Sequence, residues 1–162
     1  MLALMTPDAE QAERWLRQAG VRHYICDQCH GIHISELQSR DGVLDSRLFV
    51  EHQSILFSTE LEIRPGALFS VMAELAQLNM SWPSLKLFVD LSDDSLPRLV
   101  CCQTLLTRHG VTFDQFFHFV QSSSEAMFQV LDQCAMAHWL FRDDEGEDFA
   151  SGDAACGQDA LH

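Results

Sequence analysis

Apolar residues recur along the chain first at helical and then at strand spacing. Pro7 and Asp8 start a helix that Gly20 ends. Beyond it, apolar and polar positions alternate, as in strands with one solvated face. The predicted elements are, in chain order, a helix between Pro7 and Gly20, a hairpin over 22–37, strands over 44–50 and 55–63, a helix over 65–79, strands over 85–91 and 99–106, and a long helix from the N-cap Thr112 to about Phe141.

This order predicts an α+β fold for one domain over residues 1–142. The expected architecture is a twisted antiparallel sheet with helices packed on one face, in the order α-β-β-β-β-α-β-β-α. A chain of 162 residues has the usual length of a single domain. Residues 143–162 hold seven acids and no base, and we expect them to form an acidic, disordered tail.

The long helix carries more apolar surface than one sheet covers. Its apolar residues span an arc of roughly 200°. They are Phe113, Phe116, Phe117, Phe119, Val120, Met127, Phe128, Val130, Leu131 and Cys134. Either loops and the first helix cover the flanks of this arc, or a second copy of the chain does. For a homodimer we expect Phe119 at an exposed position of the interface, so that Phe119→Glu gives folded monomers.

The charge balance disfavours nucleic acid as a partner. The chain has 24 acidic and 10 basic residues, a formal net charge of −14, and no Arg or Lys between Thr112 and Phe141. We see no export signal and no apolar run of about 18 residues, so we expect a cytoplasmic protein with no membrane span. In that compartment its six cysteines are expected to be thiols or metal ligands.

The Cys26-x-x-Cys29-His30 motif lies in the turn of the predicted hairpin. Covalent haem attachment needs an exported chain and an open pocket, so we exclude it. Zinc would need a third ligand, His33 or His30, and a fourth from His23, a distant cysteine or a partner chain. A redox-active disulfide is disfavoured because a β-turn lacks the helix dipole of thioredoxin-like motifs. We therefore expect two thiols at a turn, with no bound metal or other cofactor.

Other candidate catalytic residues have simpler explanations. Glu60 and Glu62 share one face of a strand, where exposed carboxylates are common. Cys101 and Cys102 are neighbours on a strand and point to opposite faces, which favours packing. The chain has no P-loop, G-x-G-x-x-G, H-E-x-x-H or G-x-S-x-G motif. We assign no catalytic, cofactor-binding or metal residue and expect no enzyme.

Several short stretches resemble those of one bacterial family, the YbjN sensory transduction regulators, over about residues 10–146. The matching positions are Cys26, Asp27, Cys29 and His33; 41–43 and Asp45; 55–58; Arg64 and Pro65; Asp93, Asp94, Leu96, Pro97 and Leu99; Cys102 and Gln103; 110–112, Gln115, Phe116, Phe119 and Val120; 143–146; Leu161 and His162. The resemblance implies a fold like that of type III secretion chaperones and a role in motility, exopolysaccharide, biofilm or stress control. It implies no catalytic residues.

The sequence thus predicts a non-enzymatic regulator that acts by binding an unidentified protein, along the face that carries Phe49, Leu56 and Phe88. A secretion or effector chaperone, which holds an extended partner segment, is the first alternative. A metal or redox sensor that uses Cys26, Cys29 and His33 is the second.

Overall fold

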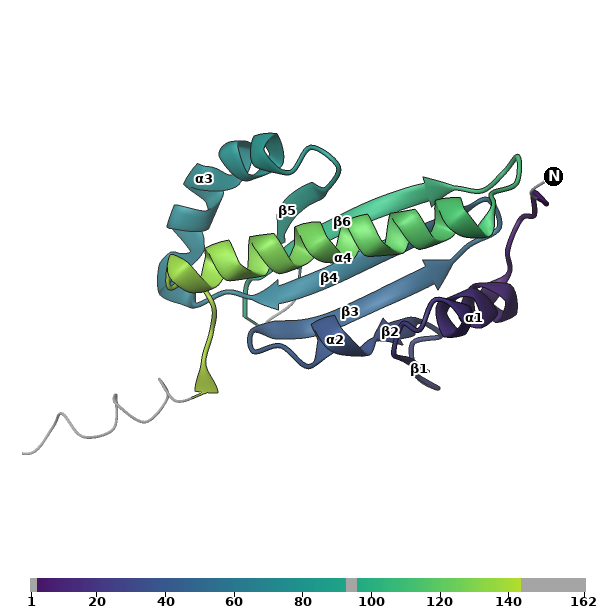
Figure 1. Cartoon of the computed structure of the whole chain (residues 1–162). Helices are drawn as coiled ribbons and strands as arrows, with labels where there is room; N and C mark the ends of the chain where they lie inside the picture. Colours follow the sequence, from purple (N-terminus) through teal and green to yellow (C-terminus); the bar gives the residue numbers. More distant parts are fainter. Residues whose placement is uncertain (1–2, 93–95, 144–162) are drawn as a thin grey trace, which may run out of the picture.

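The computed structural model describes residues 3–92 and 96–143. Its elements follow the predicted order, with the short helices α2 and η1 in addition (Figure 1). They are α1 (Ala9–Gln18), β1 (His23–Ile25), β2 (Ile32–Ile34), α2 (Ser35–Gln38), β3 (Val43–Val50), β4 (Ser54–Glu62), η1 (Pro65–Ala67), α3 (Leu68–Ser81), β5 (Lys86–Asp90), β6 (Arg98–Leu106) and α4 (Phe113–Met136). The tail predicted for residues 143–162 lies outside the described residues except for Asp143.

The strands form one antiparallel sheet in the order β1-β2-β3-β4-β6-β5. The predicted α+β class is therefore confirmed. The central strand β4 pairs along its length with β6, from Ser54 opposite Leu106 to Glu62 opposite Arg98. At the outer edge of β5, the Asn79 side chain donates to the carbonyl oxygen of Leu87 and accepts from its N–H, both at 3.0 Å. These two hydrogen bonds pair backbone groups of an edge strand that could otherwise bind a further strand.

The two faces of the sheet differ in burial. Along β4, Ile55, Phe57, Thr59 and Leu61 are buried, whereas the residues between them are only half-buried. The buried set faces the helices: α4 crosses in front of the sheet in Figure 1, α1 and α2 lie on the same side, and α3 lies beside β5. The opposite face, which we call the open face, carries no helix of the described part of the chain.

Helix α4 begins as predicted and ends earlier than predicted. The Thr112 side chain accepts from the Gln115 N–H at 3.2 Å, and the Gln115 side chain accepts from the Thr112 N–H at 2.9 Å, which completes a capping box. The helix ends at Met136 because His138 adopts a left-handed conformation, with φ 58°. The apolar residues beyond it turn back onto the sheet, where Leu140 bridges to Ile63. The prediction of a helix to Phe141 was wrong for this reason.

The expectation for Phe119 was also wrong. Its side chain is 4% exposed, and its ring lies edge-on to that of Phe57, with centroids 6.4 Å apart. On the flank of the arc, Trp15 of α1 packs against Phe113 and Phe116. The first helix therefore covers part of the apolar arc of α4, which agrees with the first of the two alternatives, cover by loops and the first helix. Phe119 belongs to the core, because its position on α4 points at the central strand of the sheet.

Among the described residues, no helix has both the length and the apolar character needed to cross a membrane.

Candidate functional site

The β1–β2 hairpin brings three side chains of the predicted motif together. The Sγ atoms of Cys26 and Cys29 and a ring nitrogen of His33 all lie within 4.8 Å of one another. The hairpin turn holds them there: the Cys26 N–H donates to the Gly31 carbonyl at 3.4 Å, and His30 takes a left-handed conformation with φ 54°. We call this group the hairpin cluster. Its third member is His33, and His30 is outside it.

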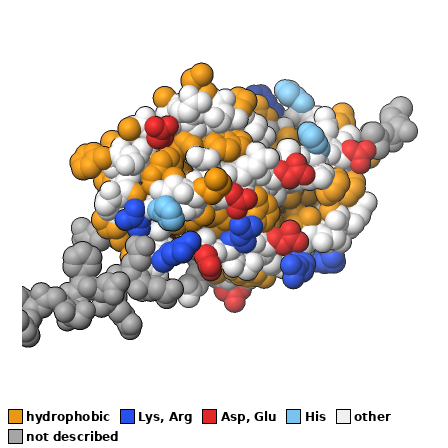
Figure 2. All heavy atoms as spheres, turned by 60° about the vertical axis from the view of Figure 1, so that its left-hand side comes forward, with side chains coloured by type: hydrophobic (Ala, Val, Ile, Leu, Met, Phe, Trp, Pro, Cys, Tyr) orange, Lys and Arg blue, Asp and Glu red, His pale blue; other side chains and the backbone are white. Residues whose placement is uncertain are grey.

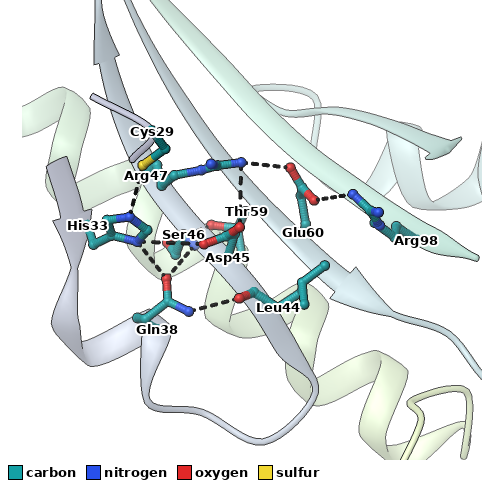
Figure 3. A network of polar contacts seen from close by, with 10 residues as sticks. All are labelled: Cys29, His33, Gln38, Leu44, Asp45, Ser46, Arg47, Thr59, Glu60 and Arg98. Carbon is teal, nitrogen blue, oxygen red and sulfur yellow. Dashed lines mark hydrogen bonds and ion pairs between the residues drawn. The ribbon is translucent and has the colours of Figure 1, made fainter. Parts of the chain in front are cut away.

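The ring of His33 is held in one orientation on the open face. It is 5% exposed and stacks on Tyr24 of β1, with centroids 4.7 Å apart and planes 2° apart. Its Nδ1 lies 2.9 Å from Oε1 of Gln38, and its Nε2 lies 3.3 Å from the Cys29 Sγ (Figure 3). The buried polar ring therefore has a partner at each nitrogen, as buried polar groups require.

Gln38 fixes Nδ1 of His33 as a hydrogen-bond donor. Its side-chain amide donates to the Leu44 carbonyl and accepts from the Ser46 N–H, both at 2.9 Å, at the irregular start of β3. These backbone partners fix Oε1 as the atom that faces Nδ1, because only an acceptor pairs with the Ser46 N–H. Nδ1 of His33 must then donate, and Nε2 faces the Cys29 Sγ.

The same surroundings favour the thiolate form of Cys29. Its pKa is lowered from 9.0 to about 6, chiefly because the backbone N–H of Gly31 donates to the sulfur. Desolvation acts in the opposite direction, and the side chains of His33, Arg47 and Cys26 lower the pKa further. Burial instead raises the pKa of the other described thiols for which a shift is found, that of Cys134 to about 12. A thiolate at neutral pH is thus a property of Cys29 and not of those cysteines.

Beside the hairpin cluster, a row of ion pairs crosses β3, β4 and β6. Glu60 accepts from Arg47 at one carboxylate oxygen and from Arg98 at the other, each at 3.1 Å, and Asp45 lies 3.6 Å from Arg47 (Figure 3). Burial tends to lower the pKa of Arg47, but Cys29, Asp45 and Glu60 outweigh it and raise that pKa. The guanidinium therefore stays charged next to the sulfur of Cys29. Its Nε is buried and has no hydrogen-bond partner among the described residues.

The remaining residues that the sequence singled out fall elsewhere. Both carboxylate oxygens of Glu60 are paired with arginines, so Glu60 is not free to act as an acid or base together with Glu62. Cys101 is buried and Cys102 half-buried on opposite faces of β6, as predicted. His23, considered as a fourth zinc ligand, is hydrogen-bonded to the Val21 carbonyl at 2.8 Å and lies outside the hairpin cluster.

Sequence reasoning missed the residues that support the cluster. They are Tyr24, Gln38, Asp45, Arg47 and Arg98. The alternation of Asp45 and Arg47 on a strand was a signal for a polar face. Nothing local to Gln38 indicated its role, because the bonds that it makes depend on how α2 meets β3.

Fold and site together define a helix-backed antiparallel α+β domain with a thiol–imidazole cluster in its edge hairpin. A family model described as "YbjN: Putative bacterial sensory transduction regulator" matches residues 8–136. The chain belongs to the YbjN family. The resemblance found in the sequence is confirmed by this match.

Solved and curated relatives agree with the family. The chain is 38% identical over 149 residues to "Uncharacterized protein YbjN" of Escherichia coli strain K12, covering 91% of this chain and 94% of that protein, and equally similar to the Shigella flexneri protein of the same name. A solved structure, "Crystal structure of YbjN, a putative transcription regulator from E. coli", superimposes with a TM-score of 0.82 and 35% identity, covering 86% of this chain and 99% of that one. None of these descriptions names an enzyme.

Proposed function

We propose that this chain is a non-enzymatic regulatory protein of the cytoplasm that acts by binding another protein with the open face of its sheet. The descriptions of the family and of the E. coli crystal structure, which both name a regulator, support this role. The observation that carries the proposal is the accessible apolar surface on that face. A sheet face with such residues is typical of a binding surface.

The apolar residues of the open face form two patches. Phe49 and Leu56 are half-buried register partners on β3 and β4, with Leu106 77% exposed on β6, two residues beyond the partner of Leu56. Phe88, 37% exposed on β5, lies opposite Val100. Between the two patches along the strands lie the cross-strand neighbours Arg47, Ser58, Cys102 and Lys86, whereas Glu60 is level with Phe88. The groove expected at Phe49, Leu56 and Phe88 is therefore two apolar patches with charged residues between them.

The charge of the chain indicates the chemistry of the partner. With a net charge of −14, the chain attracts positively charged proteins at long range. We therefore propose a basic segment of a partner protein as the occupant of the open face, its apolar side chains on the two patches and its basic groups beside Glu62. A secretion or effector chaperone would use the same face, and the identity of the partner separates it from a regulator.

A control variant for testing the open face needs an exposed apolar residue that lies elsewhere on the surface. Hydrophobic side chains also reach the surface in several groups among charged ones in the view of Figure 2. Phe69 of α3 is 82% exposed and is not on the sheet. Phe69→Asp changes the surface by the same substitution as Phe88→Asp while leaving the open face intact.

The test is affinity capture from the native cytosol with chemical cross-linking, for wild type, Leu56→Asp, Phe88→Asp and Phe69→Asp, each checked for folding by thermal melting. We expect wild type and Phe69→Asp to retain the same protein, at least tenfold more than the open-face variants do, and cross-links from it to the open face. Leu106→Asp, at an exposed position, replaces Leu56→Asp if that variant does not fold. Equal retention by all variants, or cross-links confined to the helices, would overturn the proposal.

A further inference from the structure

We propose that Cys26, Cys29 and His33 form a binding site for one thiophilic divalent metal ion of the zinc type. This inference does not rest on the proposed protein binding, because a metal titration needs no partner. It goes beyond the two free thiols that the motif alone favoured. The structure adds the third donor and its orientation.

The donor atoms are already close to the spacing that a metal ion requires. In a tetrahedral zinc site with Zn–S of about 2.3 Å and Zn–N of about 2.0–2.1 Å, ligand atoms lie about 3.4–3.8 Å apart. Here Cys29 Sγ and His33 Nε2 are 3.3 Å apart, and all three donors lie within 4.8 Å of one another. A movement of about 1 Å in the Cys26 side chain is enough to close the set.

The ring of His33 is prepared for coordination through Nε2. Ligating histidines commonly donate their other N–H to a fixed acceptor, which sets the tautomer and the ring orientation. Gln38 is that acceptor at 2.9 Å, and the Asp45 carboxylate lies 3.6 Å from the same nitrogen. Tyr24 stacks on the ring and prevents it from turning. Nε2, the atom that would ligate the metal, therefore already faces the Cys29 sulfur without any rearrangement of β2.

The electrostatics of the site suit a dication. Metal ions bind thiolates, and the backbone N–H of Gly31 donates to the sulfur of Cys29, which favours that form of the ligand. Two thiolates neutralise the charge of the ion. The nearby guanidinium of Arg47 is itself neutralised by Asp45 and Glu60, so that it does not repel the ion with a full charge.

The donor set also indicates which ions fit. Two sulfur atoms and one imidazole select zinc and similar ions over magnesium or calcium, which prefer oxygen. Among the described residues the hairpin cluster has no fourth protein donor. Three protein ligands leave one position for water or another exchangeable ligand. The site is thus suited to reversible binding.

The experiment is a titration of the reduced, metal-free full chain with zinc chloride in competition with a chromogenic chelator. We expect one equivalent per chain for wild type. Cys29→Ser and Cys26→Ser should each weaken binding at least 100-fold, and Gln38→Leu about 10-fold, because it removes only the partner of Nδ1. Cys102→Ser is the matched control: Cys102 is a half-buried thiol of the same sheet face that lies outside the cluster.

Cobalt(II) provides a spectroscopic readout that does not depend on any variant. Wild type with one equivalent of cobalt should show thiolate-to-cobalt charge-transfer absorption and the visible bands of tetrahedral coordination. The proposal is overturned if wild type binds no stoichiometric zinc, if Cys29→Ser binds as tightly as wild type, or if the cobalt spectrum lacks the charge-transfer band. Formation of a Cys26–Cys29 disulfide under air, with dioxygen as the oxidant, despite excess zinc would likewise overturn it, in favour of a redox role.

Discussion

Truncation of Phe119 separates a core position from a subunit interface. In the structure the side chain is 4% exposed, and the ring contacts Phe57, which is fully buried. Phe119→Ala should therefore destabilise the fold in every copy of the chain, whatever its oligomeric state. The same substitution in an interface would instead weaken association and leave a folded monomer.

The size of the effect follows from the burial. Removing a buried phenylalanine ring loses its transfer free energy, about 1.5–3 kcal/mol, and leaves a cavity that brings the total to about 3–5 kcal/mol. The edge-on contact with Phe57 accounts for about 0.5–1.5 kcal/mol of that total. Since a domain of this size is typically stable by about 5–15 kcal/mol, the variant should fold but unfold at much lower denaturant concentration.

The assay is urea unfolding followed by circular dichroism at two protein concentrations tenfold apart. Phe69→Ala is the control, and a change of less than about 0.5 kcal/mol is expected because Phe69 is 82% exposed. A loss below about 1 kcal/mol for Phe119→Ala, with an unchanged urea dependence, would refute the core assignment. A midpoint that rises with protein concentration in wild type but not in the variant would place Phe119 in an interface.

Four further predictions address the site and the long helix. The rate of alkylation of Cys29 by iodoacetamide in reduced, metal-free protein should have its pH midpoint near 6, the pKa that its surroundings set. His33→Gln should raise this midpoint, and a wild-type midpoint near 9 contradicts the prediction. The pKa of Cys29 in the folded protein lies below the ordinary value of 9.0, so the thiolate stabilises wild type relative to Cys29→Ser. This difference in the free energy of unfolding should be full above pH 9, decrease between pH 9 and 6, and be absent below pH 6. Calorimetry at several pH values checks that the difference decreases as the pH falls. Thr112→Ala should cost about 1 kcal/mol in urea unfolding, through loss of the capping box, and an unchanged midpoint contradicts the cap. Gln38→Leu should lower the free energy of unfolding by about 1–3 kcal/mol in the same assay, because it leaves the Ser46 N–H and the Leu44 carbonyl unpaired. The control Gln133→Leu, at an exposed position, should change it very little, and equal losses for the two variants refute the role of Gln38.

The order of the main elements was predictable because each has a local signal. The alternation from Ile55 to Ile63 indicated β4, with bounds shifted by one residue, and Thr112 was placed correctly as the N-cap of α4. The four-residue helix α2 was missed, since a single turn between a strand and a bend has no periodicity to detect. The end of α4 was misplaced because Trp139 and Leu140 are apolar for a tertiary reason, their return to the sheet.

The candidate site was predictable only in part. The spacing of Cys26 and Cys29 in a hairpin was visible in the sequence, and His33 was one of two possible third residues. The choice of His33 over His30 depends on which ring the β2 strand directs to the open face. The lowered pKa of Cys29 and the orientation of His33 depend on Gly31, Gln38 and Arg47, whose positions come from strand pairing.

The sequence by itself determined the class of fold, the order of its principal elements, the family and the acidic charge, because periodicity, caps, turns and composition act over a few residues at a time. Only the tertiary structure decided that Phe119 is a core residue, that α1 covers the flank of α4, and that Arg47 and Lys86 lie between the two apolar patches of the open face. It also decided that a glutamine from α2 fixes Nδ1 of His33 as a hydrogen-bond donor. These features require side chains far apart in the chain to meet, and which ones meet is set by strand register and helix packing.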